Sequence, residues 1–279
     1  MSRTQGWTEV AKNRGQKQNR IPPFAPSPKE QKIYQEFIKK TSASDLPRRA
    51  LILGATPELR DLSIKAGLES HAVDISQEMM SKFSKLMDNG GNRLDKRIIC
   101  DWLKMNFPDN NFGVIMGDAS LINLPTRSGN LKLIKKCRKF LKSGGYLVLR
   151  QLVYPETYKG YKKAGELIND YRKGKVTWED FFMELRMITF RKQVFNQKTC
   201  QFDAGKAFKK IEDLYKKSLL KKEEFDRINL FRNNIINTFF PEKEFVKTVE
   251  GEGFKLVRVF KDKPHLFFNY LYMMVFQKE

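Results

Sequence analysis

Short apolar runs alternate with amphipathic stretches through the first half of the chain. Predicted strands lie within residues 50–53, 72–76, 97–103, 112–121 and 146–150, and the segments between them carry helix signals. The first run has no polar interruption after Ala50, which is typical of a central parallel strand buried on both faces. This alternation of strands and helices predicts an α/β fold built around a parallel sheet.

The turn after the first predicted strand has the features of a nucleotide-binding βαβ unit. Gly54 lets the chain turn where a ligand must approach closely, and Thr56 and Pro57 suit the N-cap and first position of the next helix. Gly67 is placed to end that helix. Asp74 then follows the second apolar run, where such folds place an acid that accepts hydrogen bonds from ribose hydroxyls.

The glycine pattern disfavours a dinucleotide. A pyrophosphate site needs the pattern G-x-G-x-x-G, but Thr56 and Leu59 occupy the second and third glycine positions. A smaller adenosyl ligand without a phosphate tolerates these side chains better. We therefore expect an adenosyl ligand rather than NAD or FAD.

From residue 50 to 153, and again from Pro241, the order of strands, turns and acids resembles that of class I S-adenosylmethionine-dependent methyltransferases. The resemblance implies a Rossmann-like seven-stranded sheet, mostly parallel with one antiparallel strand, and helices on both faces. It also implies S-adenosylmethionine as the cofactor. The chain departs from the family pattern at Ile52, where an acid is usual, and at Thr56 and Glu58, where glycines are usual.

The same resemblance assigns cofactor-binding residues. In the family, the glycine loop holds the methionine part of the cofactor and the acid after the second strand holds the ribose. The acid and aromatic after the third strand hold the adenine, and the loop after the fourth strand lines the reacting end. These roles carry over to Gly54, Ala55, Thr56, Asp74, Ile75, Asp101, Trp102, Gly117, Asp118 and Ala119.

Segments outside the predicted core suggest an arm and an insert. A lid helix is expected to begin at Ser27, where Glu30 completes a capping box. The expected divisions are a basic N-terminal arm with this lid helix (1–49), the cofactor-binding core (50–155), a helical cap insert (156–240) and the C-terminal part of the core sheet (241–279).

Within the insert, helix signals predict three helices, at 156–172, from Thr177 onward and at 204–220. The end of the chain predicts two closing strands, at 254–260 and 267–276, which pair antiparallel as is usual in the family.

Composition narrows the setting of the protein. No apolar segment reaches the ~18 residues that a membrane span needs, and the polar start lacks an export signal, so we expect a cytoplasmic protein with no membrane partner. Cys100, Cys137 and Cys200 are widely separated, which argues against a metal site or disulfides. The net charge of +21 is densest in the arm but spread along the whole chain, which favours solvated lysine-rich faces over a nucleic-acid track.

Methyl transfer from an activated donor mainly requires that the acceptor be positioned and water excluded, so no catalytic triad is expected. Asp118 is a candidate base, and Arg150, Tyr154 and His265 are weaker candidates. The loop at 118–121 lacks the Asn/Asp-Pro-Pro-aromatic motif with which similar enzymes hold planar amines. The sequence therefore predicts a methyltransferase for a small-molecule acceptor. An RNA-directed methyltransferase and a non-catalytic S-adenosylmethionine-binding protein remain as alternatives.

Overall fold

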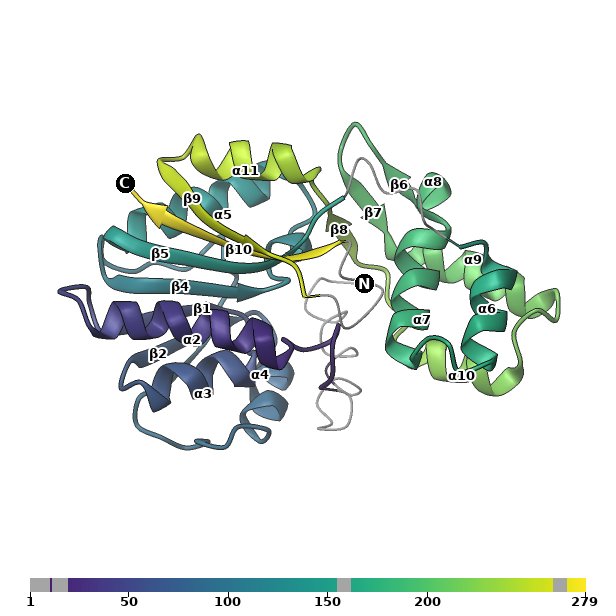
Figure 1. Cartoon of the computed structure of the whole chain (residues 1–279), viewed down its shortest axis with the longest axis horizontal. Helices are drawn as coiled ribbons and strands as arrows, with labels where there is room; N and C mark the ends of the chain where they lie inside the picture. Colours follow the sequence, from purple (N-terminus) through teal and green to yellow (C-terminus); the bar gives the residue numbers. More distant parts are fainter. Residues whose placement is uncertain (1–10, 12–19, 155–161, 263–269) are drawn as a thin grey trace.

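The chain folds into an α/β core with a smaller insert at one end of its sheet (Figure 1). The computed structural model describes residues 11, 20–154, 162–262 and 270–279. No helix in these ranges combines the length and the apolar character needed to cross a membrane.

A seven-stranded sheet in the order β3-β2-β1-β4-β5-β10-β9 forms the centre of the core. Pairing is parallel from β3 through β5, and β10 runs antiparallel to both β5 and β9. One reversed strand in this described sheet confirms the predicted fold class and the antiparallel pairing of the last two strands. The strands are β1 (Arg49–Leu53), β2 (Glu69–Asp74), β3 (Asp95–Ile99), β4 (Phe112–Asp118), β5 (Leu141–Leu152), β9 (Phe254–Phe260) and β10 (Leu271–Lys278).

Helices cover both faces of the sheet. Side chains alternate between faces along a strand, so Ala50 and Ile52 of β1 pack on one layer of helices while Leu51 and Leu53 pack on the other. Burial on both faces explains the uninterrupted apolar run in this strand. The first layer contains α2 (Pro28–Ser42), α3 (Pro57–Lys65) and α4 (Gln77–Ser84), and the second contains α5 (Arg127–Phe140) and α11 (Glu242–Glu250).

Helix ends follow the local sequence signals with one exception. The Ser27–Glu30 capping box forms at the start of α2, and Pro57 is the first residue of α3. Gly67 follows α3 with a φ of 71°. Thr56 occupies the N-cap position of α3, but its side chain makes no capping hydrogen bond and lines a cleft instead.

The fifth strand begins earlier than the sequence predicts. The predicted strand covers 146–150, but β5 follows α5 directly and begins at Leu141. Gly144 has a φ of 79°, and the pairing register of β4 with β5 shifts between Phe112 and Val114. The glycines therefore sit in an irregularity at the start of the strand, because their conformational freedom serves a bulge rather than a separate loop.

The insert between β5 and α11 combines helices with a small sheet. Its elements are α6 (Ala164–Arg172), α7 (Trp178–Glu184), the π-helical turn η3 (Leu185–Thr189), α8 (Arg191–Val194), β6 (Phe195–Asn196), β7 (Gln201–Asp203), α9 (Ala204–Lys216), α10 (Lys222–Asn229) and β8 (Ile236–Thr238). The expectation of a purely helical insert is corrected, because β6, β7 and β8 pair as an antiparallel sheet. Strands of two or three residues are too short for an alternating pattern to mark them in a sequence. Of the helix predicted at 156–172, the described part is α6, and residues 155–161 lie outside the described ranges.

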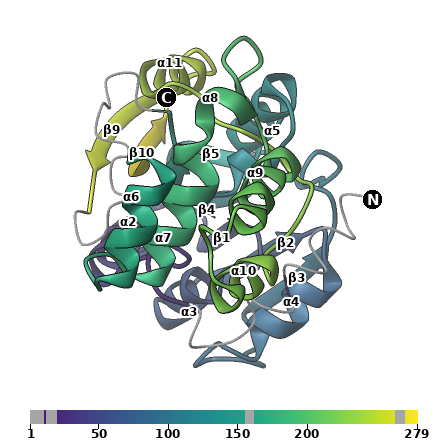
Figure 2. The same ribbon diagram turned by 90° about the vertical axis from the view of Figure 1, so that its right-hand side faces the viewer.

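Seen from its own side, the insert lies over the ends of the central strands (Figure 2). Its interior is a hydrophobic cluster rich in aromatic side chains, including Phe181 and Phe202. This cluster also takes in Phe24 of the N-terminal segment, Leu152 of β5 and Leu271 of β10. The insert and the core therefore meet across a packed apolar boundary.

One carboxyl group is buried in this insert. Glu184, at the end of α7, is only 5% exposed. Burial, with a smaller contribution from Asp180, raises its pKa from 4.5 to about 8, although Arg191 and Lys162 act in the opposite direction. The folded protein therefore holds a proton on Glu184 at pH values where the unfolded chain has released it. The resulting contribution to stability is complete below pH 4.5 and is lost as the pH rises to about 8.

We predict that Glu184→Gln removes this pH dependence. The amide resembles the protonated carboxyl group, so the variant and the wild type should have similar free energies of unfolding near pH 5, whereas the variant should be more stable by about 2–4 kcal/mol near pH 8. Guanidinium unfolding at several pH values measures the difference. Glu166→Gln, at an exposed position of α6, is the control, and its free energy of unfolding should match that of the wild type at every pH. Parallel curves for wild type and Glu184→Gln would contradict the assignment.

Candidate functional site

A cleft opens where the carboxyl ends of the sheet strands meet the insert. The strand-end residues that line it are Leu53 of β1, Asp74 of β2, Asp118 of β4 and Leu152 of β5, and α7, η3 and the segment before β8 form the opposite wall. Its empty volume, open mouth included, is about 1350 Å³. Ligands of open α/β sheets bind at this edge as a general rule.

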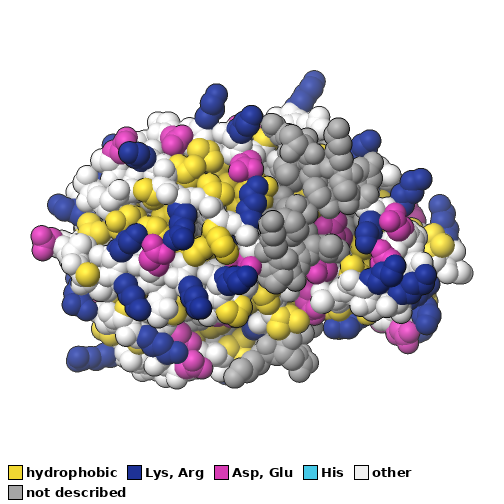
Figure 3. All heavy atoms as spheres, in the orientation of Figure 1, with side chains coloured by type: hydrophobic (Ala, Val, Ile, Leu, Met, Phe, Trp, Pro, Cys, Tyr) yellow, Lys and Arg dark blue, Asp and Glu magenta, His cyan; other side chains and the backbone are white. Residues whose placement is uncertain are grey.

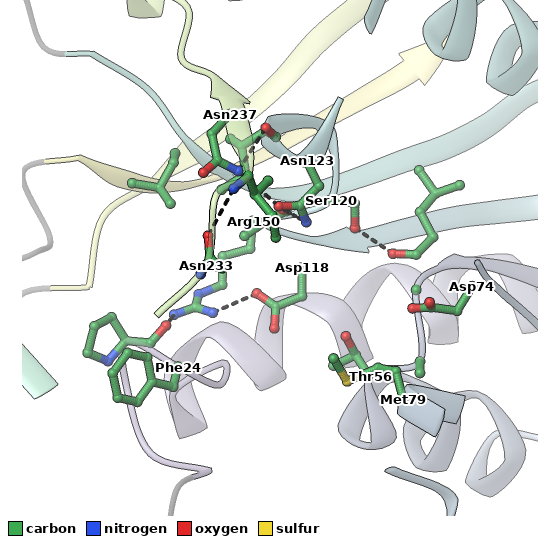
Figure 4. Close-up of a pocket in the computed structure, with 18 of the residues that line it drawn as sticks. Phe24, Thr56, Asp74, Met79, Asp118, Ser120, Asn123, Arg150, Asn233 and Asn237 are labelled. Atoms are coloured by element: carbon green, nitrogen blue, oxygen red, sulfur yellow. Dashed lines mark hydrogen bonds and ion pairs between the residues drawn. The ribbon is translucent and has the colours of Figure 1, made fainter. Parts of the chain in front are cut away.

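The cleft has two ends of different character (Figure 4). Thr56 and Asp74 lie toward one end, Phe24 and Asn233 toward the other, and Asp118 lies between them. The core end comprises Gly54, Ala55, Thr56, Asp74, Ile75, Asp101 and Trp102, and the insert end comprises Phe24, Phe182, Met183, Arg186, Met187, Phe231, Asn233, Ile235 and Asn237.

Nearly all of the predicted cofactor residues reach this cleft. Gly117 is the exception: it is not among the lining residues, and its carbonyl accepts a hydrogen bond from the Tyr34 hydroxyl at 2.8 Å. The predicted residues that line the cleft are Gly54, Ala55, Thr56, Asp74, Ile75, Asp101, Trp102, Asp118 and Ala119.

The glycine turn brings two of these side chains together. Gly54 has a φ of +119°, a conformation that residues with a Cβ rarely adopt. A Cβ added there would lie 3.8 Å from Asp74 Oδ2 and 3.9 Å from Trp102 Cζ2. The absence of a side chain at Gly54 therefore keeps open the space that Asp74 and Trp102 border.

Hydrogen bonds to the backbone orient the acids and the indole of the core end. Ser76 N donates to Asp74 Oδ1 at 2.8 Å, and Leu103 N donates to Asp101 Oδ1 at 2.9 Å. Trp102 Nε1 donates to the Val73 carbonyl at 2.6 Å. The strand predicted at 97–103 ends earlier, at Ile99, so Asp101 and Trp102 belong to the loop after β3. A loop position lets both side chains turn into the cleft rather than alternate across the sheet.

A buried ion pair lies next to the glycine turn and is hydrogen-bonded to its backbone. Arg60 of α3 and Asp95 of β3 have side chains that are 0% and 2% exposed, and Arg60 Nε donates to Asp95 Oδ1 at 3.0 Å. Arg60 also donates to Ser84 Oγ at 2.9 Å and to the Ala55 carbonyl at 3.4 Å. This pair ties the loop after β1 to α4 and β3. No sequence pattern predicts this pair, because a charged residue in an amphipathic helix is normally assigned to the solvent side.

Arg150 is the centre of a second buried network. Its guanidinium donates to Asp118 Oδ1 at 2.6 Å and to the Pro23 carbonyl at 2.7 Å, and its Nε lies 2.9 Å from Glu30 Oε2. Burial disfavours the charged form, but the charges of Asp118 and Glu30 outweigh it and raise the pKa of Arg150. Asp118, the candidate base, is therefore held as the ion-pair partner of Arg150.

The Tyr34 hydroxyl extends this network to the backbone of β4 and β5. It donates to the Gly117 carbonyl and accepts from Arg150 N at 3.1 Å. Burial, with a smaller contribution from Asp118, raises the pKa of Tyr34 well above its ordinary value, so the phenol stays protonated. Helix α2 is thereby fixed to the strand ends that border the cleft.

Tyr154, a weaker candidate for catalysis, is not among the residues that line the cleft. Tyr154 lines a separate small cavity, stacks on Phe195 and accepts a hydrogen bond from Arg191 Nε at 3.3 Å. His265 lies outside the described residues. Within the described ranges, no three His, Cys, Asp or Glu side chains converge as metal ligands would.

Sequence patterns did not identify the residues of the insert end. Asn237 Nδ2 donates to the Ile122 carbonyl and to Asn123 Oδ1, both at 3.2 Å, and Asn123 Nδ2 donates to the Ala119 carbonyl at 3.0 Å. These bonds connect the loop after β4 to β8 of the insert. Asparagine is a common turn residue, so nothing in the sequence marks Asn123 or Asn237 as lining residues.

We predict that Glu30→Gln destabilises the protein by about 2–4 kcal/mol, because it removes one carboxylate from a buried guanidinium. Glutamine preserves the capping box, so the loss isolates the ion pair from the helix cap. Glu36→Gln, in the same helix but 39% exposed, is the matched control and should cost less than about 1 kcal/mol. Guanidinium unfolding measures both variants. Equal losses of unfolding free energy in the two variants would show that the ion pair of Glu30 with Arg150 does not stabilise the protein.

Comparison with known proteins agrees with this geometry. The family model described as a methyltransferase domain matches residues 54–149, from the glycine turn into β5. None of the curated proteins matches the chain.

Solved structures share the fold. The CcbJ methyltransferase from Streptomyces caelestis has a TM-score of 0.57 at 12% identity, with 100% of this chain and 98% of that chain covered. A Rhodobacter sphaeroides protein provisionally named a Zn-dependent alcohol dehydrogenase has a TM-score of 0.58 at 13% identity, with 100% and 99% covered. The 1,6-didemethyltoxoflavin-N1-methyltransferase from Burkholderia thailandensis has a TM-score of 0.51 at 11% identity, with 89% and 77% covered. At these identities each likeness concerns the fold alone. Residues 54–149 are thus similar to a methyltransferase domain, and the fold of the chain is one that solved methyltransferases share.

Proposed function

We propose that this protein is an S-adenosylmethionine-dependent methyltransferase whose acceptor is a small molecule enclosed at the insert end of the cleft. The observation that carries the proposal is the two-ended cleft itself, with acids and an indole at the core end and mainly apolar side chains at the insert end. The Burkholderia thailandensis enzyme of the same fold was solved with 1,6-didemethyltoxoflavin and S-adenosylhomocysteine bound, which supports a small-molecule acceptor.

The residues of the core end fit the cofactor. Gly54 leaves space beside Asp74 and Trp102 that a Cβ would narrow. We propose that Asp74 accepts hydrogen bonds from the ribose hydroxyls and that Asp101, beside Trp102, accepts one from the adenine amino group. When bound, S-adenosylmethionine supplies an electrophilic methyl group.

The protein itself positions the acceptor and the cofactor and excludes water from the cleft. The insert covers the strand ends, and the Arg150 network fixes Asp118 and the Pro23 backbone as parts of the wall. An acceptor held at the insert end would face the core end across Asp118. Holding both reactants in one orientation provides most of what a displacement of this type requires.

The two alternatives are distinguished by separate observations. On the face shown in Figure 3, Lys and Arg side chains are dispersed among Asp and Glu over the core and the insert, unlike the concentrated cations of an RNA track. Salt-dependent RNA binding would favour the RNA-directed alternative. Cofactor binding without methyl transfer to any acceptor would favour the non-catalytic one.

We predict that Asp74→Ala weakens S-adenosylhomocysteine binding by about 2–4 kcal/mol, because two hydrogen bonds to a charged acceptor are lost. Isothermal titration calorimetry measures the affinity. Asp88→Ala, which removes an exposed carboxylate paired with Lys65, is the control and should leave it unchanged. Unchanged affinity in Asp74→Ala would remove this residue from the site.

We predict that Asp101→Ala weakens S-adenosylhomocysteine more than S-inosylhomocysteine. The inosyl analogue lacks the exocyclic amine from which Asp101 would accept a hydrogen bond, so the substitution should reduce its affinity less. The same calorimetric titrations, run with both ligands on the wild type and the variant, give the comparison. Equal losses for the two ligands would refute the adenine assignment.

A further inference from the structure

We infer that Asn237 binds the acceptor, and that the acceptor is an aromatic molecule whose hydroxyl or amino group donates a hydrogen bond to Asn237 Oδ1. The inference rests on the proposed function and specifies its substrate class. It depends on the orientation of the Asn237 amide and on the aromatic wall of the insert end.

A chain of hydrogen bonds fixes the orientation of the Asn237 amide (Figure 4). Asn123 Nδ2 donates to the Ala119 carbonyl, so Asn123 turns its Oδ1 toward Asn237. Asn237 Nδ2 donates to this oxygen and to the Ile122 carbonyl, both at 3.2 Å. A reversed amide would set Asn237 Oδ1 against two acceptor oxygens, so only one orientation satisfies the chain of bonds.

This orientation leaves Asn237 Oδ1 as the atom that can receive a ligand. Among the residues that the structure describes, none donates a hydrogen bond to it. Asn237 lines the cleft and is only 5% exposed, and an amide oxygen in such a surrounding costs free energy until a donor reaches it. Both protons of Nδ2 are already used. The amide can therefore accept from an O–H or N–H group of the ligand but cannot donate to a carbonyl or an ether.

Two other polar side chains of the cleft are engaged within the protein. Asn233 Oδ1 accepts from Ile235 N at 3.2 Å, and Asn233 Nδ2 donates to the Phe231 carbonyl at 3.0 Å. Ser120 Oγ donates to the Leu53 carbonyl. The open acceptor of Asn237 is thus the feature of this wall that selects for a donor group.

The aromatic residues of the insert end favour a ring as the body of the acceptor. Phe24 stacks on Phe231 with ring centroids 5.8 Å apart, and Phe182 lies 5.9 Å from Phe24 and 5.1 Å from Phe231. Aromatic pairs gain from offset and edge contacts, so a planar ligand ring can extend this arrangement. Met183 and Met187 line the same end with flexible side chains that adapt to ring faces.

The same hydrogen bonds hold Asn237 at a fixed place relative to the core end. Asn123 and Ala119 belong to the loop after β4, and both line the cleft beside Asp118, which lies between its two ends. Bonds that support a binding side chain from behind keep its position precise. A group held by Asn237 therefore keeps one position relative to the loop that borders the core end.

The test compares 6-hydroxyquinoline with 6-fluoroquinoline, which has a similar shape but no donor at that position, by calorimetry with and without S-adenosylhomocysteine. We expect wild type to bind the hydroxyl compound about ten-fold tighter. In Asn237→Leu, and in the smaller Asn237→Ala, this ratio should fall to about one while S-adenosylhomocysteine affinity stays unchanged.

The matched control is Thr238→Val. The Thr238 hydroxyl donates to the Leu124 carbonyl at 2.8 Å and so connects β8 to the same loop, but Thr238 is not among the lining residues. This variant should keep the wild-type ratio. If Asn237 acted only by holding β8 to the loop, the ratio would fall in the control as well.

Equal affinity of wild type for the two quinolines, no binding of 6-hydroxyquinoline at about 1 mM, a ratio that survives in the Asn237 variants, or a ratio that also falls in Thr238→Val would each overturn the inference. Failure of wild type to bind S-adenosylhomocysteine would instead overturn the proposed function. Because the quinoline titrations are also run without that ligand, the hydroxyl preference is measured in either case.

Discussion

The buried guanidinium of Arg150 is the interaction on which the architecture of the cleft depends. It binds Asp118 at the end of β4, Glu30 in the first turn of α2 and the Pro23 carbonyl, so three separate segments share one cation. Removing a partner from a buried ion pair leaves an uncompensated charge, which costs more than the pair itself contributes. The segment before α2 is therefore fixed to the sheet, and Phe24 next to Pro23 is held at the insert end.

The parts of the fold that local chemistry determines could be predicted from the sequence. A glycine with positive φ at Gly54, a proline at the first position of α3 and the Ser27–Glu30 box each act within a few residues, so their signals are visible in the chain. Strand β1 is buried on both faces, so its sequence is an uninterrupted apolar run. Similar runs alternate with helix signals along the chain, and this alternation predicted a parallel sheet. Asp74 and Asp101 were found because strand ends place acids at one edge of the sheet.

The parts that depend on distant partners could not be predicted. Arg60 and Arg186 lie in helical segments where a sequence assigns charge to solvent, yet both are buried by contacts with residues elsewhere in the chain. Asp118 was expected to be a candidate base, and only the fold shows that Arg150 holds its carboxylate. The short strands of the insert likewise exist because of pairing partners rather than because of their own pattern.

The hydrophobic interior is divided into three clusters, two on the faces of the sheet and one centred in the insert. Side chains of the insert can change without altering the two clusters that pack on the faces of the sheet. Because of this division, the residues of the core end can stay the same among related proteins while the residues of the insert end diverge. A directed-evolution library confined to α7, η3 and the approach to β8 would sample new acceptors at little risk to the sheet.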